Sequence, residues 1–355
     1  MESKKGIQFF NKVSLRELSL FTRSLSATIS AGLPIVKALT VIKDQTDNEF
    51  FKGIIKDIVK RLEEGERFSS ALSRYPKVFN RVYVASVQAA EASGKFDIVL
   101  EDLANTLEKD YKLDSSIKGA LAYPLFIVFA MVITATILLI VVVPKIKTVF
   151  QESEITLPLA TRMLIAAGSF LANYWYLVLL ILIGFIIWFR YFLKSPQGYI
   201  FYSKLLLKVP LIKDLFVAVY MTRFTNTLGM LTQAGVPIVN AVKLVSYVVN
   251  NAVYSQILKR VAYQLERGVP MSSPLSKSKE FPAIVSQMIA VGEQTGKLEE
   301  ILSSLTKFYE EETNRKVTLA SSLLEPILLI IVGAGVGVMV FSIIIPLYQL
   351  AGSMS

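Results

Sequence analysis

Two Gly-Lys pairs, Gly94-Lys95 and Gly296-Lys297, are the residues whose types could bind a phosphate. A phosphate-binding loop also needs a glycine five residues before the pair and Ser or Thr after it, at a strand-to-helix turn. The earlier positions hold Ala89 and Val291, and a large apolar residue follows each pair. The spacing therefore argues against a nucleotide site.

Other catalytic chemistry has little support in the sequence. The chain contains no histidine, which is the commonest general base and metal ligand, and no cysteine. The HExxH and GxSxG motifs of hydrolases are also missing. We therefore expect no catalytic residues, no metal and no cofactor.

A glutamate stands three residues before each glycine of these pairs, at Glu91 and Glu293. If Gly94 and Gly296 end helices, each glutamate lies in a last helical turn, where the helix dipole disfavours an anion by roughly 0.3–1 kcal/mol. This placement occurs twice, so each glutamate needs a partner. The partner is either an Arg or Lys of the same domain or another protein. The glycines themselves are expected to form the turn.

The elements that position these residues include long apolar stretches. Pro124–Pro144 and Pro326–Pro346 each enclose nineteen residues without a charge, and residues 174–189 form a further apolar stretch with aromatic residues at its ends. About 20 apolar helical residues cross a bilayer core of about 30 Å. With a mean hydropathy of +0.51 and 19% charged residues, the composition indicates polar domains joined to membrane helices.

The remaining sequence is helical in pattern and is duplicated. Gly32 and Pro34 recur as Gly235 and Pro237 at an offset of 203 residues, and both pairs are expected to form structural turns between helices. The Glu-x-x-Gly-Lys segments recur at an offset of 202. A period of this length indicates a duplicated domain.

We therefore expect an all-α membrane protein with two homologous cytoplasmic bundles of about six helices each and three transmembrane helices. The expected segments are an N-terminal tail (1–13), a first bundle (14–123), a first transmembrane helix (124–143), an extracytoplasmic segment (144–170), a second transmembrane helix (171–193), a second bundle (194–325), a third transmembrane helix (326–346) and an extracytoplasmic tail (347–355).

Two helix starts can be predicted at single residues. Ser14 and Glu17 have the spacing of a capping box, in which each side chain bonds the backbone of the other. Asp47 is expected to cap a third helix of the first bundle.

The distribution of basic residues predicts the orientation. Of 38 Lys and Arg residues, 19 precede residue 124, 16 lie within residues 190–316, three lie between the first two spans and none follows Pro346. The positive-inside rule then places both bundles in the cytoplasm, with the N-terminus inside and the C-terminus outside.

Gly333 and Gly337 in the last span have the GxxxG spacing that permits close helix packing, within the chain or between protomers.

Three classes of protein can be compared. No span contains a charged residue in its interior, whereas ion pathways normally keep such residues. A transporter or channel component is thus the alternative to a structural platform, and a membrane-bound enzyme is disfavoured for want of catalytic residues.

The chain resembles the PilC/GspF family in the order of its motifs. AG[LV]PI turns, Glu-x-x-Gly-Lys turns and proline-bounded spans occur in the same order in both repeats. The resemblance also includes Leu157-Pro158-Leu159 and Val209-Pro210-Leu211. Members of this family are inner-membrane platform proteins of type IV pilus and type II secretion machines. The resemblance implies a non-enzymatic protein that couples a cytoplasmic hexameric assembly ATPase to the extraction and polymerisation of pilin or pseudopilin subunits.

The resemblance also implies the partners. These are the assembly ATPase and in some machines a retraction ATPase, pilins or pseudopilins, other inner-membrane assembly proteins, the lipid bilayer and a second copy of the chain in a homodimer or higher oligomer, but no nucleic acid. It marks Glu91, Gly94, Glu293 and Gly296 as signature positions and candidates for partner contact. Pilus, DNA-uptake and secretion machines all remain compatible with the sequence.

Overall fold

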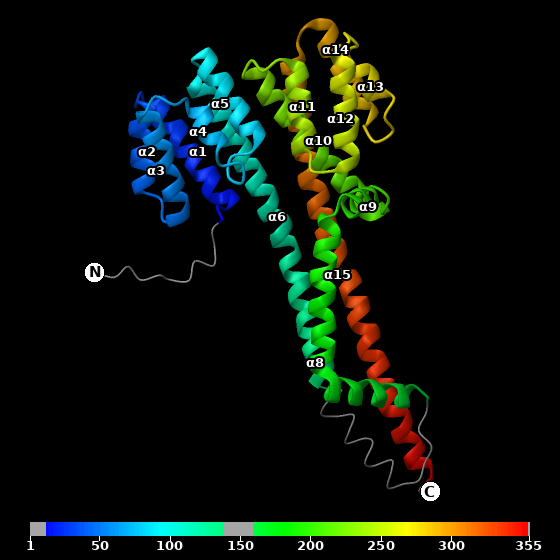
Figure 1. Cartoon of the computed structure of the whole chain (residues 1–355). Helices are drawn as coiled ribbons and strands as arrows, with labels where there is room; N and C mark the ends of the chain where they lie inside the picture. Colours follow the sequence, from blue (N-terminus) through cyan, green and yellow to red (C-terminus); the bar gives the residue numbers. More distant parts are fainter. Residues whose placement is uncertain (1–11, 138–158, 354–355) are drawn as a thin grey trace, which may run out of the picture. The chain divides into compact units, whose positions relative to one another are not determined.

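The computed structural model describes residues 12–137 and 159–353, and every element of regular secondary structure in these residues is a helix. Figure 1 shows the helices in chain order, from α1 in blue to α15 in red. The first half contains α1 (Leu15–Ser30), α2 (Ile35–Asp44), α3 (Glu49–Glu63), α4 (Phe68–Ser73), α5 (Arg81–Ser93) and α6 (Phe96–Ile137). The second half contains α8 (Leu159–Lys194), α9 (Pro196–Leu206), α10 (Pro210–Gln233), α11 (Ile238–Val248), α12 (Ala252–Leu265), α13 (Ser272–Ser276), α14 (Ala283–Thr295) and α15 (Leu298–Ser353).

The described residues fall into two units. The first is drawn from Met1–Ser115 and Ser203–Arg315 and holds both helical bundles. The second is drawn from Ser116–Tyr202 and Lys316–Ser355 and holds the apolar stretches. The bundle of α1–α5 with the start of α6 has the same helix order as that of α10–α14 with the start of α15, so the predicted all-α fold with a duplicated bundle is confirmed.

Buried aromatic rings recur at the centre of both bundles. In the first bundle, the ring centroid of Phe21 lies 5.2 Å from that of Phe51 and 5.9 Å from that of Phe79. The equivalent rings of the second bundle are those of Phe224, Tyr254 and Phe281. Such ring pairs add roughly 0.5–1.5 kcal/mol beyond the burial of their area, so each bundle has its own specific core.

One predicted helix cap is confirmed and one is wrong. Ser14 and Glu17 form the capping box, with the Ser14 N–H donating to Glu17 Oε2 at 2.7 Å and the Glu17 N–H donating to Ser14 Oγ at 3.2 Å. The cap of α3 is Asn48 and not Asp47. Asn48 accepts from two N–H groups of α3, and its amide also donates to Glu17 Oε1 at 2.9 Å. A carboxylate could not make that last bond, which ties α1 to α3.

Three helices are long and apolar enough to cross a membrane, over Phe96–Thr134, Tyr176–Lys194 and Leu298–Gly337. α6 continues from the first bundle into its apolar stretch with Pro124 inside the helix, and α15 continues likewise from the second bundle. α8 already begins at Leu159 and has non-helical backbone at Tyr174, where φ is −124° and ψ is 23°. The predicted tail residues 1–11 and 354–355 lie outside the described residues, as do residues 138–158 of the first span and the extracytoplasmic segment.

Candidate functional site

Glu91 lies near the end of α5 and its side chain reaches the start of α4. Its carboxylate accepts from the Ser69 N–H at 3.2 Å and from the Ser69 hydroxyl. The N-cap residue of α4, Arg67, makes no side-chain hydrogen bond to the helix, so Glu91 caps this short helix from a distance. A carboxylate at a helix N-terminus is stabilised both by the free N–H groups and by the helix dipole.

Glu293 makes the same connection in the second bundle. It accepts from the Met271 N–H at 2.5 Å, from the Ser272 N–H at 3.1 Å and from the Ser272 hydroxyl at 2.6 Å. A contact with another protein stays a prediction, and the partner seen in the structure lies inside the bundle. Its chemistry differs from the expected Arg or Lys, because the positive end of α13 supplies the charge complement.

The glycines after these glutamates form left-handed turns. Gly94 has φ of 71° and Gly296 has φ of 70°, a conformation that costs other residues roughly 1–2 kcal/mol. Gly32 and Gly235, each two residues before a proline, also have positive φ. In the Gly94 and Gly296 turns, the glycine and the following lysine are exposed, so each turn presents a Gly-Lys tip at the start of α6 or α15.

The glycines of the last span have no close neighbour in the described residues. A Cβ atom built on Gly333 or Gly337 would meet nothing within 4 Å. Packing of these glycines against another helix or another protomer therefore stays a prediction.

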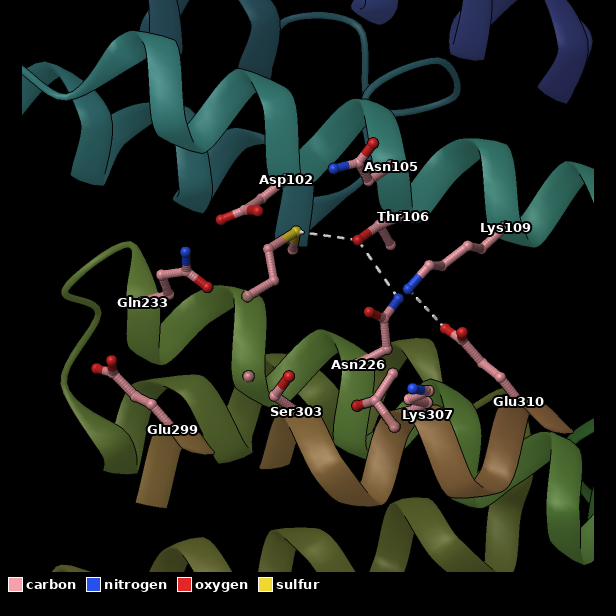
Figure 2. Close-up of a pocket in the computed structure, with 13 residues that line it drawn as sticks. Asp102, Asn105, Thr106, Lys109, Asn226, Gln233, Glu299, Ser303, Lys307 and Glu310 are labelled. Carbon is pink, nitrogen blue, oxygen red and sulfur yellow. Dashed lines mark hydrogen bonds and ion pairs between the residues drawn. The ribbon is translucent and has the colours of Figure 1, made fainter. Parts of the chain in front are cut away.

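Sequence reasoning did not find the polar cavity of about 430 Å³ that lies in the first unit between α6, α10 and α15. Figure 2 shows Thr106 and Lys109 of α6 opposite Asn226 of α10 and Glu310 of α15. The Asn226 amide donates to Thr106 Oγ1 at 3.3 Å, and Lys109 Nζ lies 2.8 Å from Glu310 Oε1. These contacts join the two bundles. The helices that the structure describes contain no group of three or more potential metal ligands, in this cavity or elsewhere.

The two repeats differ at a residue that lines this cavity, Asn226, which is equivalent to Arg23 of the first repeat. In the first repeat, Arg23 Nε donates to Glu108 Oε1 at 2.6 Å within the bundle. Asn226 and Glu310 stand at the equivalent positions of the second repeat, at offsets of 203 and 202 residues. Because Asn226 carries no charge, Glu310 pairs with Lys109 of the other bundle instead. The signal in the sequence is that an arginine of the first repeat is replaced by an uncharged residue in the second repeat, while the equivalent glutamate is kept.

Comparison with known proteins agrees with the duplication. The family described as "Type II secretion system (T2SS), protein F" matches this chain twice, at residues 21–144 and 224–346. The two matches begin 203 residues apart and end 202 residues apart, which are the offsets of the repeat.

Individual relatives extend over nearly the whole chain. The type IV pilus assembly protein PilC of Thermus thermophilus is 34% identical over 96% of this chain and 84% of its own length. PilC of Myxococcus xanthus is 31% identical over 97% of this chain and 82% of its own length. The type II secretion system protein F of Pseudomonas aeruginosa is 32% identical over 97% of this chain and 85% of its own length.

The three apolar helices and these relatives together indicate an inner-membrane protein. The double match, the duplicated bundles and the near full-length similarity have one explanation: this chain belongs to the type II secretion system protein F family, which includes the PilC proteins of type IV pilus assembly.

Proposed function

We propose that this protein is a non-enzymatic inner-membrane platform. It would couple a cytoplasmic hexameric assembly ATPase to the extraction and polymerisation of pilin or pseudopilin subunits. Its relatives are named for type IV pilus assembly and for type II secretion, and this supports a role in a machine of that kind.

The observation that carries the proposal is the continuity of α6 and α15. Each helix begins directly after an exposed Gly-Lys turn, contributes buried residues such as Leu100 or Leu302 to the core of its bundle, and then continues into an apolar stretch. A continuous helix resists bending because each residue is held by i to i−4 hydrogen bonds. Movement imposed on the turn would therefore be passed along the helix toward the membrane.

The orientation in the proposal follows from charge. The 35 basic residues that precede residue 124 or lie within residues 190–316 support cytoplasmic bundles, a cytoplasmic N-terminus and an extracytoplasmic C-terminus. The bundles would then face the ATPase, while the spans face the pilin or pseudopilin in the bilayer. Other inner-membrane assembly proteins and a second copy of the chain would complete the platform.

The Gly-Lys tips are the proposed contacts with a cytoplasmic partner. Glu91 and Glu293 hold the neighbouring helix ends and would act by keeping each turn in place, whereas Lys95 and Lys297 are exposed. Lys297 pairs with the nearby exposed Glu300, at 3.3 Å, and such a pair is weak enough to exchange for a partner's carboxylate.

A pull-down tests the proposal. The full-length protein in mild detergent is mixed with the hexameric assembly ATPase of the same cell, and bound ATPase is measured. The Lys95→Glu and Lys297→Glu double variant should lose most of the ATPase, while a control with Lys56→Glu and Lys277→Glu, both exposed, should retain it.

Two other outcomes would change the proposal. Equal retention by both variants would move the contact away from the Gly-Lys tips and leave the platform standing. No retention by the folded wild-type protein would contradict coupling to that ATPase.

A further inference from the structure

A second cavity, of about 490 Å³, lies in the first unit and has a different character. We call it the lysine pocket, because four of its lining residues are Lys204, Lys208, Lys213 and Lys279. Among the described residues that line it, Glu280 is the only acidic one. Four lysines that line one cavity give it a positive charge, which favours an anionic ligand.

The lysines of the pocket are not neutralised by the protein. Across residues 12–137 and 159–353, none of the four has a carboxylate within ion-pair distance, whereas Lys52, Lys60, Lys109, Lys243 and Lys297 each have one. The pocket therefore keeps a net positive charge that is available to an anionic ligand.

Hydrogen bonds fix two walls of the pocket next to these lysines. Ser203, which precedes Lys204, accepts from the Ala252 N–H through its hydroxyl at 3.0 Å and from the Asn251 amide through its carbonyl at 3.2 Å. The Tyr254 hydroxyl donates at 2.7 Å to the carbonyl of Glu280, which follows Lys279. The backbone on both sides of the cavity is thus held in position before a ligand binds.

Along the sequence, Lys204 of the pocket follows closely after the end of a membrane span. The span Tyr176–Lys194 ends ten residues before Lys204, and ten helical residues extend about 15 Å. The chain bends tightly between α8 and α9, since a Cβ atom on Gly198 would lie 1.9 Å from the Phe192 carbonyl oxygen. Only a short length of chain therefore separates Lys204 from the end of the span.

The exposed surface of α9 suits the membrane interface. Phe201 is 60% exposed and Leu205 is 44% exposed, and Tyr199 and Tyr202 are exposed as well. Aromatic rings prefer the boundary between headgroups and acyl chains.

We infer that the lysine pocket binds the phosphate of an anionic phospholipid headgroup, with the apolar side chains of α9 against the acyl chains. The lysines supply the charge that selects an acidic lipid over a zwitterionic one, because polybasic segments near a membrane attract anionic headgroups. This inference does not depend on the ATPase or on pilins, and it gives the second bundle a lipid contact of its own.

Native mass spectrometry of the full-length protein in non-ionic detergent tests the inference. The probes are phosphatidylglycerol and phosphatidylcholine with the same acyl chains. A pocket variant carries Lys204→Gln, Lys208→Gln, Lys213→Gln and Lys279→Gln. A control variant carries Lys37→Gln, Lys56→Gln, Lys77→Gln and Lys95→Gln, which are exposed on the first bundle and change the net charge equally.

The wild-type protein and the control should retain phosphatidylglycerol in preference to phosphatidylcholine. The pocket variant should lose at least about tenfold in affinity for phosphatidylglycerol, since each lysine near an anionic surface contributes about fivefold. Equal retention by the pocket variant and the control would overturn the inference.

A further arm separates lipid from free phosphate. Millimolar inorganic phosphate should neither raise the Tm of the wild-type protein relative to the pocket variant nor displace phosphatidylglycerol. If inorganic phosphate alone does both, the pocket is a site for a soluble anion, and the assignment to a lipid is overturned.

Discussion

At the scale of single residues, the repeated glutamates show what a sequence can predict. Repetition singled out Glu91 and Glu293, and the helix dipole indicated that each needs a partner. The partners recur too, as Ser69 and Ser272, but they lie 22 and 21 residues away in the chain. Only the packing of α4 on α5 and of α13 on α14 brings them together, so charge pattern alone could not identify them.

Glu293→Gln should destabilise the protein by about 1–2 kcal/mol, which is the usual effect of losing a charged cap. The amide keeps one acceptor oxygen, but it cannot accept from both the Met271 and Ser272 N–H groups and the Ser272 hydroxyl as a carboxylate does. Thermal unfolding in detergent measures the change. Glu63→Gln, at an exposed helix position, serves as the control. An equal Tm for the two variants would contradict the capping role.

Asp57 should contribute to stability in a pH-dependent way. The hydrogen bond from the Tyr75 hydroxyl, at 2.6 Å, and then that from Arg61 Nε, at 2.6 Å, lower the pKa of Asp57 below its ordinary value of 3.8. A carboxyl group whose folded pKa is depressed contributes stability above its unfolded pKa, and this contribution is lost as the pH falls through the folded pKa. At pH 7 the loss in Asp57→Asn should be at most about 1 kcal/mol, because the group is partly exposed.

The measurement is the Tm of wild-type protein and Asp57→Asn between pH 7 and pH 2. The difference should be largest at neutral pH and should shrink below the ordinary pKa of 3.8. A difference that stays constant across this range would mean that the variant acts through packing and not through charge.

At the scale of elements, periodicity and turn residues predicted the helices of both bundles, but not where the long helices end. The sequence pattern separated the last bundle helix from the first span, whereas α6 is continuous from Phe96 to Ile137. The residues between the two, Gly119 to Tyr123, include good helix formers and no charge, so nothing there stops the helix. Pro124 is accommodated within the helix.

If continuity of α6 transmits movement, weakening the helix outside the apolar stretch should separate binding from assembly. Ser115→Gly with Ser116→Gly costs roughly 0.5 kcal/mol for each residue in helix propensity at two exposed positions. The variant should still retain the ATPase in the pull-down, while pilus or secretion output in complemented cells falls several-fold.

Ser115→Ala with Ser116→Ala is the matched control for the glycine pair, since alanine keeps the helix and removes the same hydroxyl groups. Its output should equal that of the wild-type protein. Undiminished output from the glycine variant would show that helix continuity at this point is not used.

At the scale of the whole molecule, duplication predicted the two bundles and the span that follows each of them, because both follow from features that recur. The span of residues 174–189 does not recur and was predicted from its apolar length. The contact between the bundles depends on residues that do not recur. Arg23 in the first repeat is replaced by Asn226 in the second, and this leaves Glu310 to pair across to Lys109. A search for motifs that the repeats share does not detect positions at which the repeats differ. The polar cavity was therefore not predicted.

This asymmetry can be reversed. Asn226→Arg should restore to the second bundle the internal ion pair that Arg23 and Glu108 form in the first. The introduced arginine would compete with Lys109 for Glu310, and the coupling between the bundles should weaken. A double-mutant cycle with Lys109→Ala and Glu310→Ala measures that coupling, which should be roughly 0.2–1 kcal/mol for a partly exposed pair.

The cycle is repeated in the Asn226→Arg background and in a control background, Asn240→Arg, which adds the same charge at an exposed site on α11. Coupling should fall to near zero in the first and persist in the second. Persistence in both would mean that Glu310 reaches Lys109 regardless of its neighbour in α10, and the loss of an arginine would not explain the contact. Loss in Asn226→Arg alone would show that Glu310 pairs with Lys109 because the second repeat has no arginine at position 226.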